Sequence, residues 1–134
     1  MLEGDFREKI LACPAPEVVF FDLFSPKHCP DLWGYESFVL LRESMKDSPP
    51  SSVVTTYSSS TAVRAALLYA GFVVGYGVST DAKLQTTVAS LSKETLKKPL
   101  DDAWFKKRLR SSRPNPHDLP THLTLTDLRE NQLC

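Results

Sequence analysis

Short apolar runs recur along the chain, separated by polar or amphipathic segments. The first run, residues 17–22, is continuous, β-branched and aromatic, which is typical of a parallel strand buried on both faces. Three later runs have the composition of strands and cover residues 52–57, 72–74 and 85–89. The glycines and polar residues of 75–81 predict a loop between the last two runs. The pattern therefore predicts four strands.

Two amphipathic segments lie between the first three strands. Residues 35–46 place apolar side chains at helical spacing, and the two prolines that follow prevent the helix from continuing. Residues 61–70 follow a run of serines whose hydroxyl groups suit a helix cap, and Gly71 suits the helix end. We expect the first helix to bury Phe38, Leu41 and Met45.

The order of these elements indicates the fold class. Strand, helix, strand, helix, strand, strand is an α/β arrangement, and the last two strands, which no helix separates, are expected to pair antiparallel. A mixed sheet follows. Residues 2–11 are expected to be the end of a strand followed by a helix, and residues 100–109 a basic helix anchored by Trp104 and Phe105.

Composition adds little to this interpretation. The chain has 134 residues, 42% of them hydrophobic, and a formal net charge of zero, which is ordinary for one globular domain and names no partner. Charge is nevertheless uneven, because residues 93–113 hold eight basic and three acidic side chains. We expect one domain over residues 1–116 and leave the tail, residues 117–134, unassigned.

Cysteine usage and the first residues bear on location. Three cysteines without paired spacing predict neither a disulfide framework nor a zinc site, so no metal is expected. The chain is charged from Glu3 onward, unlike a secretory signal, and no apolar run reaches the length of a membrane span. The protein is therefore expected in the cytoplasm, with no membrane as its partner.

Asp22 stands where the first predicted strand ends. In open α/β sheets ligands bind beyond the carboxyl ends of the strands, so this carboxylate is expected to face a site. One interpretation is that it accepts a hydrogen bond from a substrate amine or a cofactor and helps to remove a proton. The other is that it caps the amides of its own loop. Similarly, the rings of Phe24 and Trp33 either stack on a nucleobase or close the core beneath the loop.

A hydrolase is a weaker alternative. It would use the serines at residues 58–60 as nucleophile and His28 as base, but serines before a helix are usually caps. His28 and Cys29 also lack a second ligand cluster at informative spacing, so neither a metal site nor a nucleophile is favoured here.

The loop after Asp22 carries a specific motif. Residues 22–27 (DLFSPK) followed by residues 30–33 (PDLW) resemble the D-x-F-[SA]-P-x-K-N-P-x-[LM]-W motif of the MnmC-like methyltransferase family. The similarity continues through residues 54–59, 63–67, 70–75, 86–90 and 100–104. It covers roughly residues 2–116, and the Asp-to-Trp loop is its most specific part.

The resemblance implies a Rossmann-like methyltransferase fold, the cofactor S-adenosylmethionine, and tRNA as partner. The implied reaction methylates the aminomethyl nitrogen on carbon 5 of a wobble uridine, in 5-methylaminomethyl-2-thiouridine biosynthesis. Asp22 would be catalytic and would also contact the cofactor, whose adenine would meet Asp5 and Phe6. The implied substrate-binding residues are Phe24, Ser25, Pro26, Trp33, Tyr57 and Lys83. The basic segment would contact tRNA phosphates.

The chain also departs from the family pattern. Cys29 replaces the usual Asn, and the glycine-rich basic loop before the last strand is reduced to residues 77–83. No glycine-rich strand-to-helix turn precedes Leu2. We therefore expect the C-terminal half of the methyltransferase fold, completed by an N-terminal half or by a second copy in a homodimer. The alternative is a noncatalytic α/β module that has lost cofactor binding and pairs its sheet edge with another protein.

Overall fold

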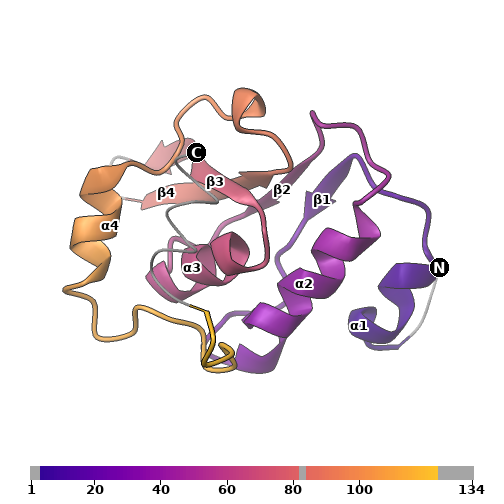
Figure 1. Ribbon diagram of the computed structural model, residues 1–134, viewed down its shortest axis with the longest axis horizontal. Coiled ribbons are helices and arrows are strands. Elements are labelled where there is room, and N and C mark those ends of the chain that lie inside the picture. The colour runs from indigo at the N-terminus through magenta and orange to yellow at the C-terminus, as the bar shows by residue number, and fades with distance from the viewer. Residues whose placement is uncertain (1–3, 82–83, 124–134) are drawn as a thin grey trace.

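The computed structural model describes residues 4–81 and 84–123, which form a four-stranded sheet with helices against it (Figure 1). The strands are β1 (Val18–Phe20), β2 (Val53–Thr56), β3 (Val73–Asp81) and β4 (Leu84–Ser90). The α-helices are α1 (Phe6–Lys9), α2 (Tyr35–Ser44), α3 (Thr61–Tyr69) and α4 (Asp102–Arg108). Short 3₁₀ helices cover Ile10–Ala12, Pro30–Trp33 and Lys93–Thr95.

The order of the strands in the sheet differs from their order in the chain. The sheet runs β1, β2, β4, β3, so the last strand lies between the second and the third. β1 and β2 are parallel, and β4 is antiparallel to both of its neighbours. This arrangement confirms the α/β class and the mixed sheet with an antiparallel last pair.

β3 is longer than the sequence pattern predicts. Residues 75–81, expected as a loop, continue the strand, with irregular pairing to β4 after Tyr76. The loop prediction was wrong because the glycines serve close packing. A Cβ on Gly75 would lie 2.6 Å from the Lys98 carbonyl oxygen, and one on Gly77 would collide with the Thr86 hydroxyl.

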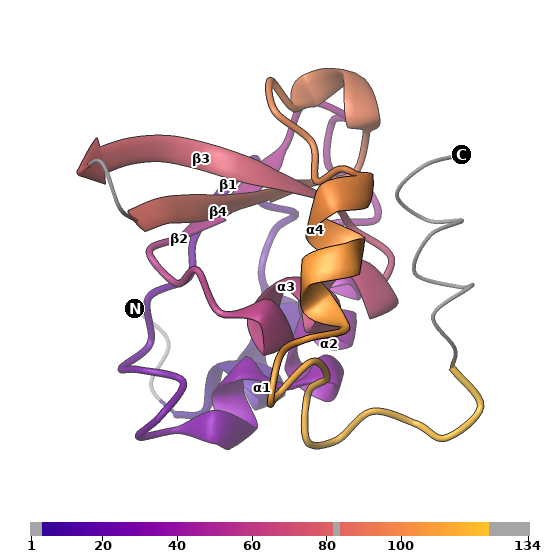
Figure 2. The ribbon, with the colours of Figure 1, turned by 90° about the vertical axis from the view of Figure 1, so that its left-hand side faces the viewer.

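Helices α1, α2 and α3 lie on one side of the sheet, as Figure 2 shows. Val54, Val74 and Ala89 are in register on neighbouring strands and are buried on this side. Alternate residues of a strand point to opposite faces, so these three belong to one layer of the core. α2 buries Phe38 and Leu41, and its C-cap residue Met45 is buried as well, as the helical spacing predicted.

β1 is buried on one face only. Val19 and Phe21 pack into the core, whereas Val18 and Phe20 lie on the opposite face, 53% and 78% exposed. The expectation of a strand buried on both faces was therefore wrong. β1 is an edge strand of the sheet, and the described residues leave its second face uncovered.

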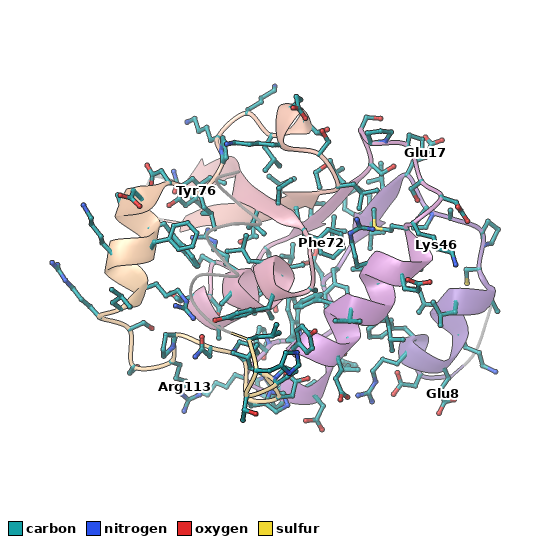
Figure 3. All side chains as sticks on the ribbon, in the orientation of Figure 1. Glu8, Glu17, Lys46, Phe72, Tyr76 and Arg113 are labelled. Carbon is teal, nitrogen blue, oxygen red and sulfur yellow. The ribbon has the colours of Figure 1, made fainter. Side chains whose placement is uncertain are left out.

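Local signals set the ends of α3. The Ser60 hydroxyl accepts a hydrogen bond from the Val63 amide at 3.5 Å, as expected of the serine run before a helix. Gly71 follows the helix with φ +102°, a left-handed conformation that favours glycine. The chain can then turn directly into the interior, where Phe72 is fully buried (Figure 3).

The start of α2 is capped by a residue far away in the sequence. The Asp118 carboxylate accepts hydrogen bonds from the amides of Tyr35 at 2.7 Å and Glu36 at 3.0 Å. Gly34 leaves room for it, because a Cβ there would lie 2.7 Å from both carboxylate oxygens. The described beginning of the predicted tail is thus attached to α2.

The first and last helices are short. α1 continues into the 3₁₀ helix Ile10–Ala12, and the two together form the helix that was expected near the N-terminus. The strand end that was expected before it falls on residues outside the described part. α4 begins at the cap Asp101 and buries Trp104 and Phe105, which confirms both anchors. None of the helices within residues 4–81 and 84–123 combines the length and apolar character needed to cross a bilayer.

Candidate functional site

Asp22 lies just beyond β1, where the parallel strands β1 and β2 both end. Its Oδ1 atom accepts hydrogen bonds from the Thr56 hydroxyl at 3.2 Å and the Tyr57 amide at 3.0 Å. Parallel pairing brings these two donors to Asp22, because they stand at the end of β2. Among the described residues, Oδ2 has no hydrogen-bond partner, and the side chain is exposed. The carboxylate is thus fixed at one oxygen and available at the other.

The loop after Asp22 is held by hydrogen bonds to its main chain. The Tyr57 hydroxyl donates to the Phe24 carbonyl at 2.7 Å, and the Trp33 indole N–H donates to the Leu23 carbonyl at 2.9 Å. Between these contacts Phe24 adopts φ +52°, a left-handed conformation that is strained for a bulky residue. The bonds on either side hold the strained turn next to the free carboxylate oxygen.

Trp33 and Phe24 have different surroundings. Trp33 is buried and its ring meets Phe21 edge-on, with centroids 5.0 Å apart. Phe24 is 74% exposed, so the interpretation that its ring closes the core is wrong. Trp33 closes the core, while Phe24 and the half-exposed Tyr57 present their rings to solvent. Of the two rings predicted to stack on a base, Phe24 and Trp33, only Phe24 is exposed, and its stacking stays a prediction.

The structure gives His28 a local partner. Its Nδ1 atom lies 2.6 Å from the Ser25 hydroxyl oxygen, and its amide donates to the same oxygen. Ser58 and Ser60, the nucleophiles of the hydrolase alternative, serve instead as acceptors for the amides of Ser60 and Val63. The serine run is a cap, as its position before a helix suggests.

Phe6 lies beside Phe21, which immediately precedes Asp22, and Asp5 is the N-cap of α1. The Phe6 ring contacts Phe21 edge-on at 5.5 Å. The Asp5 carboxylate accepts hydrogen bonds from the Arg7 amide at 2.9 Å and from its guanidinium, Nη2 to Oδ2, at 2.6 Å. The guanidinium bonds, followed by the amide bond, lower the pKa of Asp5 to about 2. An adenine amine would compete with Arg7 for this carboxylate, and that contact stays a prediction.

Replacing Arg7 with glutamine is expected to raise the pKa of Asp5 from about 2 towards the ordinary value near ~3.9. Because the folded pKa lies below the unfolded one, the Asp5 contacts stabilise the start of α1 above pH ~4 and are lost as pH falls through the folded value. Carboxyl NMR titration measures both midpoints, with Lys9→Gln as the control. Equal midpoints in wild type and Arg7→Gln would contradict the assignment.

A cavity of about 670 Å³ lies beside the Asp22 loop. Its walls come from the loop after β1, the start of α3, and residues 112–117. Two of the predicted substrate-binding residues, Pro26 and Trp33, line it. Lys83 lies outside the described residues. The other predicted site residues, which do not line this cavity, are Asp5, Phe6, Asp22, Phe24, Ser25 and Tyr57.

The basic segment 93–113 does not form one surface. Lys97 and Lys98 line a second cavity of about 560 Å³ on the face of the sheet opposite α3. Arg108 is buried and donates to the Pro114 carbonyl at 3.0 Å, whereas Arg113 lines the first cavity from the segment after α4 (Figure 3). The other exposed basic side chains on and after α4, within the segment, are Lys106, Lys107 and Arg110.

Arg64 is a buried cation that the sequence pattern does not reveal. From α3 it donates to the Thr87 hydroxyl and to the Gln85 carbonyl, both at 2.9 Å. Its guanidinium carbon lies 4.9 Å from the centre of the Tyr76 ring. Burial lowers the pKa of Arg64, and burial likewise raises the pKa of Tyr76. The cation joins α3 to the β3–β4 pair.

Comparison with known proteins identifies the family. A sequence model described as S-adenosyl-L-methionine-dependent methyltransferase matches residues 1–92. An uncharacterized protein of Methanocaldococcus jannaschii is 37% identical over 87 residues, which are 64% of this chain and 24% of that protein. The crystal structure of MNMC2 from Aquifex aeolicus matches with a TM-score of 0.72 and 30% identity, over 97% of this chain and 42% of that one. The chain spans less than half the length of both relatives. It belongs to an MnmC-like family of S-adenosylmethionine-dependent methyltransferases.

Proposed function

We propose that this chain is the substrate-facing part of a methyltransferase that methylates the aminomethyl nitrogen of a tRNA wobble uridine. The family supports S-adenosylmethionine as the cofactor, and the similarity to MNMC2 supports an MnmC-type reaction. The observation that carries the proposal is the carboxylate of Asp22, fixed at one oxygen and free at the other. It stands at the carboxyl end of a parallel strand, where ligands of α/β sheets bind.

Methyl transfer to an amine needs a neutral nitrogen whose lone pair points at the methyl carbon, so positioning supplies much of the rate. The free Asp22 oxygen can accept a hydrogen bond from one amine N–H, which orients the lone pair. It is also placed to take the proton that the nitrogen loses. The Thr56 hydroxyl and Tyr57 amide hold the other oxygen, so the carboxylate need not reorganise during the reaction. When bound, the cofactor supplies an electrophilic methyl group on a sulfonium centre.

The described residues fit one side of the cofactor. Phe6 contacts Phe21, and Asp22 is the next residue along the chain, so an aromatic ring and a carboxylate flank the same core side chain. Phe6 would contact the adenine of the cofactor, and Asp22 would lie near its reacting group. Asp5 would join them only by giving up part of its contact with Arg7.

We propose that the other side of the cofactor-binding site is formed by elements beyond the edge of β1. Val18 and Phe20 are exposed there, although parallel strands are normally covered on both faces and free edges tend to pair. Further strands, from the same polypeptide or from a second copy in a homodimer, would pair with this edge, and elements packed on the uncovered face of the sheet would bury these side chains. The exposed basic side chains of residues 93–113 support tRNA as the partner, because phosphate contacts position RNA.

A methylation assay with two matched tRNAs tests the activity. The chain, together with the strands that complete its cofactor site, is incubated with methyl-labelled S-adenosylmethionine and tRNA that carries an aminomethyl group on its wobble uridine, or the same tRNA with unmodified uridine. We expect label only in the first tRNA, with 5-methylaminomethyluridine as the product in nucleoside mass spectrometry. Label in neither tRNA would refute the proposal for this chain.

Calorimetric titration with S-adenosylhomocysteine distinguishes an enzyme from the alternative, a noncatalytic module. The exposed Phe20 at the β1 edge is consistent with that alternative too. For the enzyme we expect S-adenosylhomocysteine to bind with a Kd on the order of 1 μM to 1 mM. If a second copy completes the cofactor-binding site, light scattering should also give the mass of a dimer. Oligomers that do not bind S-adenosylhomocysteine would instead support a module that pairs through its sheet edge.

A further inference from the structure

One wall of the cavity beside the Asp22 loop is formed by a segment that hydrogen bonds hold at both ends. We call this segment, residues 112–118, the strap. Near its beginning, the buried Arg108 donates to the Pro114 carbonyl at 3.0 Å and to the side-chain oxygen of Asn115. At its end, Asp118 accepts hydrogen bonds from the first two amides of α2. These contacts make the wall a built part of the fold, because each one occupies a group that would otherwise lack a partner.

The charged side chains that line the cavity, Lys27 and Arg113, are cationic. Lys27 lines it from the loop after β1 and Arg113 from the strap, and both side chains are exposed. No carboxylate of the described residues lies within ion-pair distance of either group. His117 also lines the cavity, with its Nε2 atom 3.3 Å from the Asp31 carboxylate. Lys27 and Arg113 thus offer two unpaired positive charges to an anion.

The remaining wall is largely apolar and rigid. Trp33 is buried, and its only ring N–H is taken by the Leu23 carbonyl, so the indole is a fixed surface. The other apolar residues of the lining are Pro26, Pro30, Ala62, Val63, Pro114 and Pro116. Flat apolar faces next to free cations suit a nucleobase joined to a phosphate. A cavity of about 670 Å³ is also large enough for one nucleotide.

We propose that this cavity binds a nucleotide of the substrate RNA other than the one that is methylated. The inference rests on the proposed function. Trp33 lines the cavity and also bonds to Leu23, the residue after Asp22, so the two sites share one loop. An RNA strand that places its amine at Asp22 would place a neighbouring nucleotide against the strap, with its phosphate between Lys27 and Arg113.

Fluorescence anisotropy with a labelled RNA hairpin of anticodon stem-loop sequence tests the proposal. The double variant Lys27→Gln, Arg113→Gln is expected to bind the hairpin about tenfold more weakly, and its slope of log affinity against log salt should fall in magnitude by about one to two. The matched control is Lys9→Gln, Lys46→Gln, which removes the same charge from exposed positions outside the cavity and outside the basic segment 93–113. It is expected to weaken binding less than threefold.

Equal losses in the two double variants would overturn the proposal, because they would reflect net charge alone. Binding of uridine 5′-monophosphate as tightly as the hairpin would also overturn it, since the cavity would then suit a free nucleotide. Circular dichroism checks that both variants remain folded. The assay needs no methyl transfer, so its result stands apart from the activity. If the chain is an active methyltransferase but its Lys27→Gln, Arg113→Gln variant binds RNA normally, the cavity proposal is refuted and the proposed enzyme activity stands.

Discussion

Replacing Asp22 with asparagine is expected to lower the rate of methyl transfer by about 10²-fold or more, the range for loss of a proton-transfer group. Asparagine keeps an oxygen that can accept from the Thr56 hydroxyl and the Tyr57 amide, so the loop should keep its place. The neutral amide cannot take a proton from the substrate amine. The measurement is kcat/KM for labelled methyl transfer to the aminomethyl-bearing tRNA.

Two further variants make the Asp22 result interpretable. Asp47→Asn removes an exposed carboxylate beyond the far end of α2 and should leave kcat/KM unchanged. Asp22→Ala removes both the charge and the acceptor for Thr56 and Tyr57. Full activity in Asp22→Asn combined with loss in Asp22→Ala would show that Asp22 only holds the loop, and would sink its catalytic role.

Phe21→Ala is expected to reduce the free energy of unfolding by about 3 to 5 kcal/mol, the usual cost of removing a buried phenylalanine. Its ring lies between three others, with centroids 5.5 Å from Phe6, 5.0 Å from Trp33 and 5.1 Å from Phe38. Such aromatic pairs stabilise a protein beyond the area they bury. Urea unfolding followed by tryptophan fluorescence measures the loss, which is large against the ~5 to 15 kcal/mol of a typical domain.

The neighbouring residue provides the control for Phe21. Phe20 has the same side chain but is 78% exposed on the uncovered face of β1. In the monomeric chain, Phe20→Ala should therefore change the free energy of unfolding by no more than about 0.5 kcal/mol. A loss in Phe20→Ala as large as that in Phe21→Ala would show that both faces of β1 are covered in solution.

Elements with a strong internal period could be predicted from the sequence. The spacing of Phe38, Leu41 and Met45 is a property of one helix, so no other part of the chain is needed to recognise it. The place of β4 between β2 and β3 depends on pairing, and a β-rich run carries no record of its partners. One-sided burial of β1 escaped prediction for the same reason, because Val18 and Phe20 are apolar whether or not another layer covers them.

The site was predictable where topology alone decides. Asp22 follows a buried run, and the end of a parallel strand faces ligands in any sheet of this kind. The position of the strap could not be predicted, because Asp118 caps a helix whose first residues lie more than eighty positions earlier. Nor does charge distinguish Arg108, which is buried, from Arg110, which is exposed, although only two positions separate them.

The central position of β4 has a consequence for how the chain folds during synthesis. β2 leaves the ribosome early, but its partner residues for Val53 to Thr56 are Ser90 to Thr87, which emerge only after α3 and β3. Until then the nascent chain has one parallel pair and a third strand without a neighbour. β3 and β4 are close in sequence and can form a hairpin first, which then docks on β2 as a unit. The strand that joins the two parts of the sheet is therefore synthesised last, and a pause before residue 90 would leave two strand edges unpaired at once.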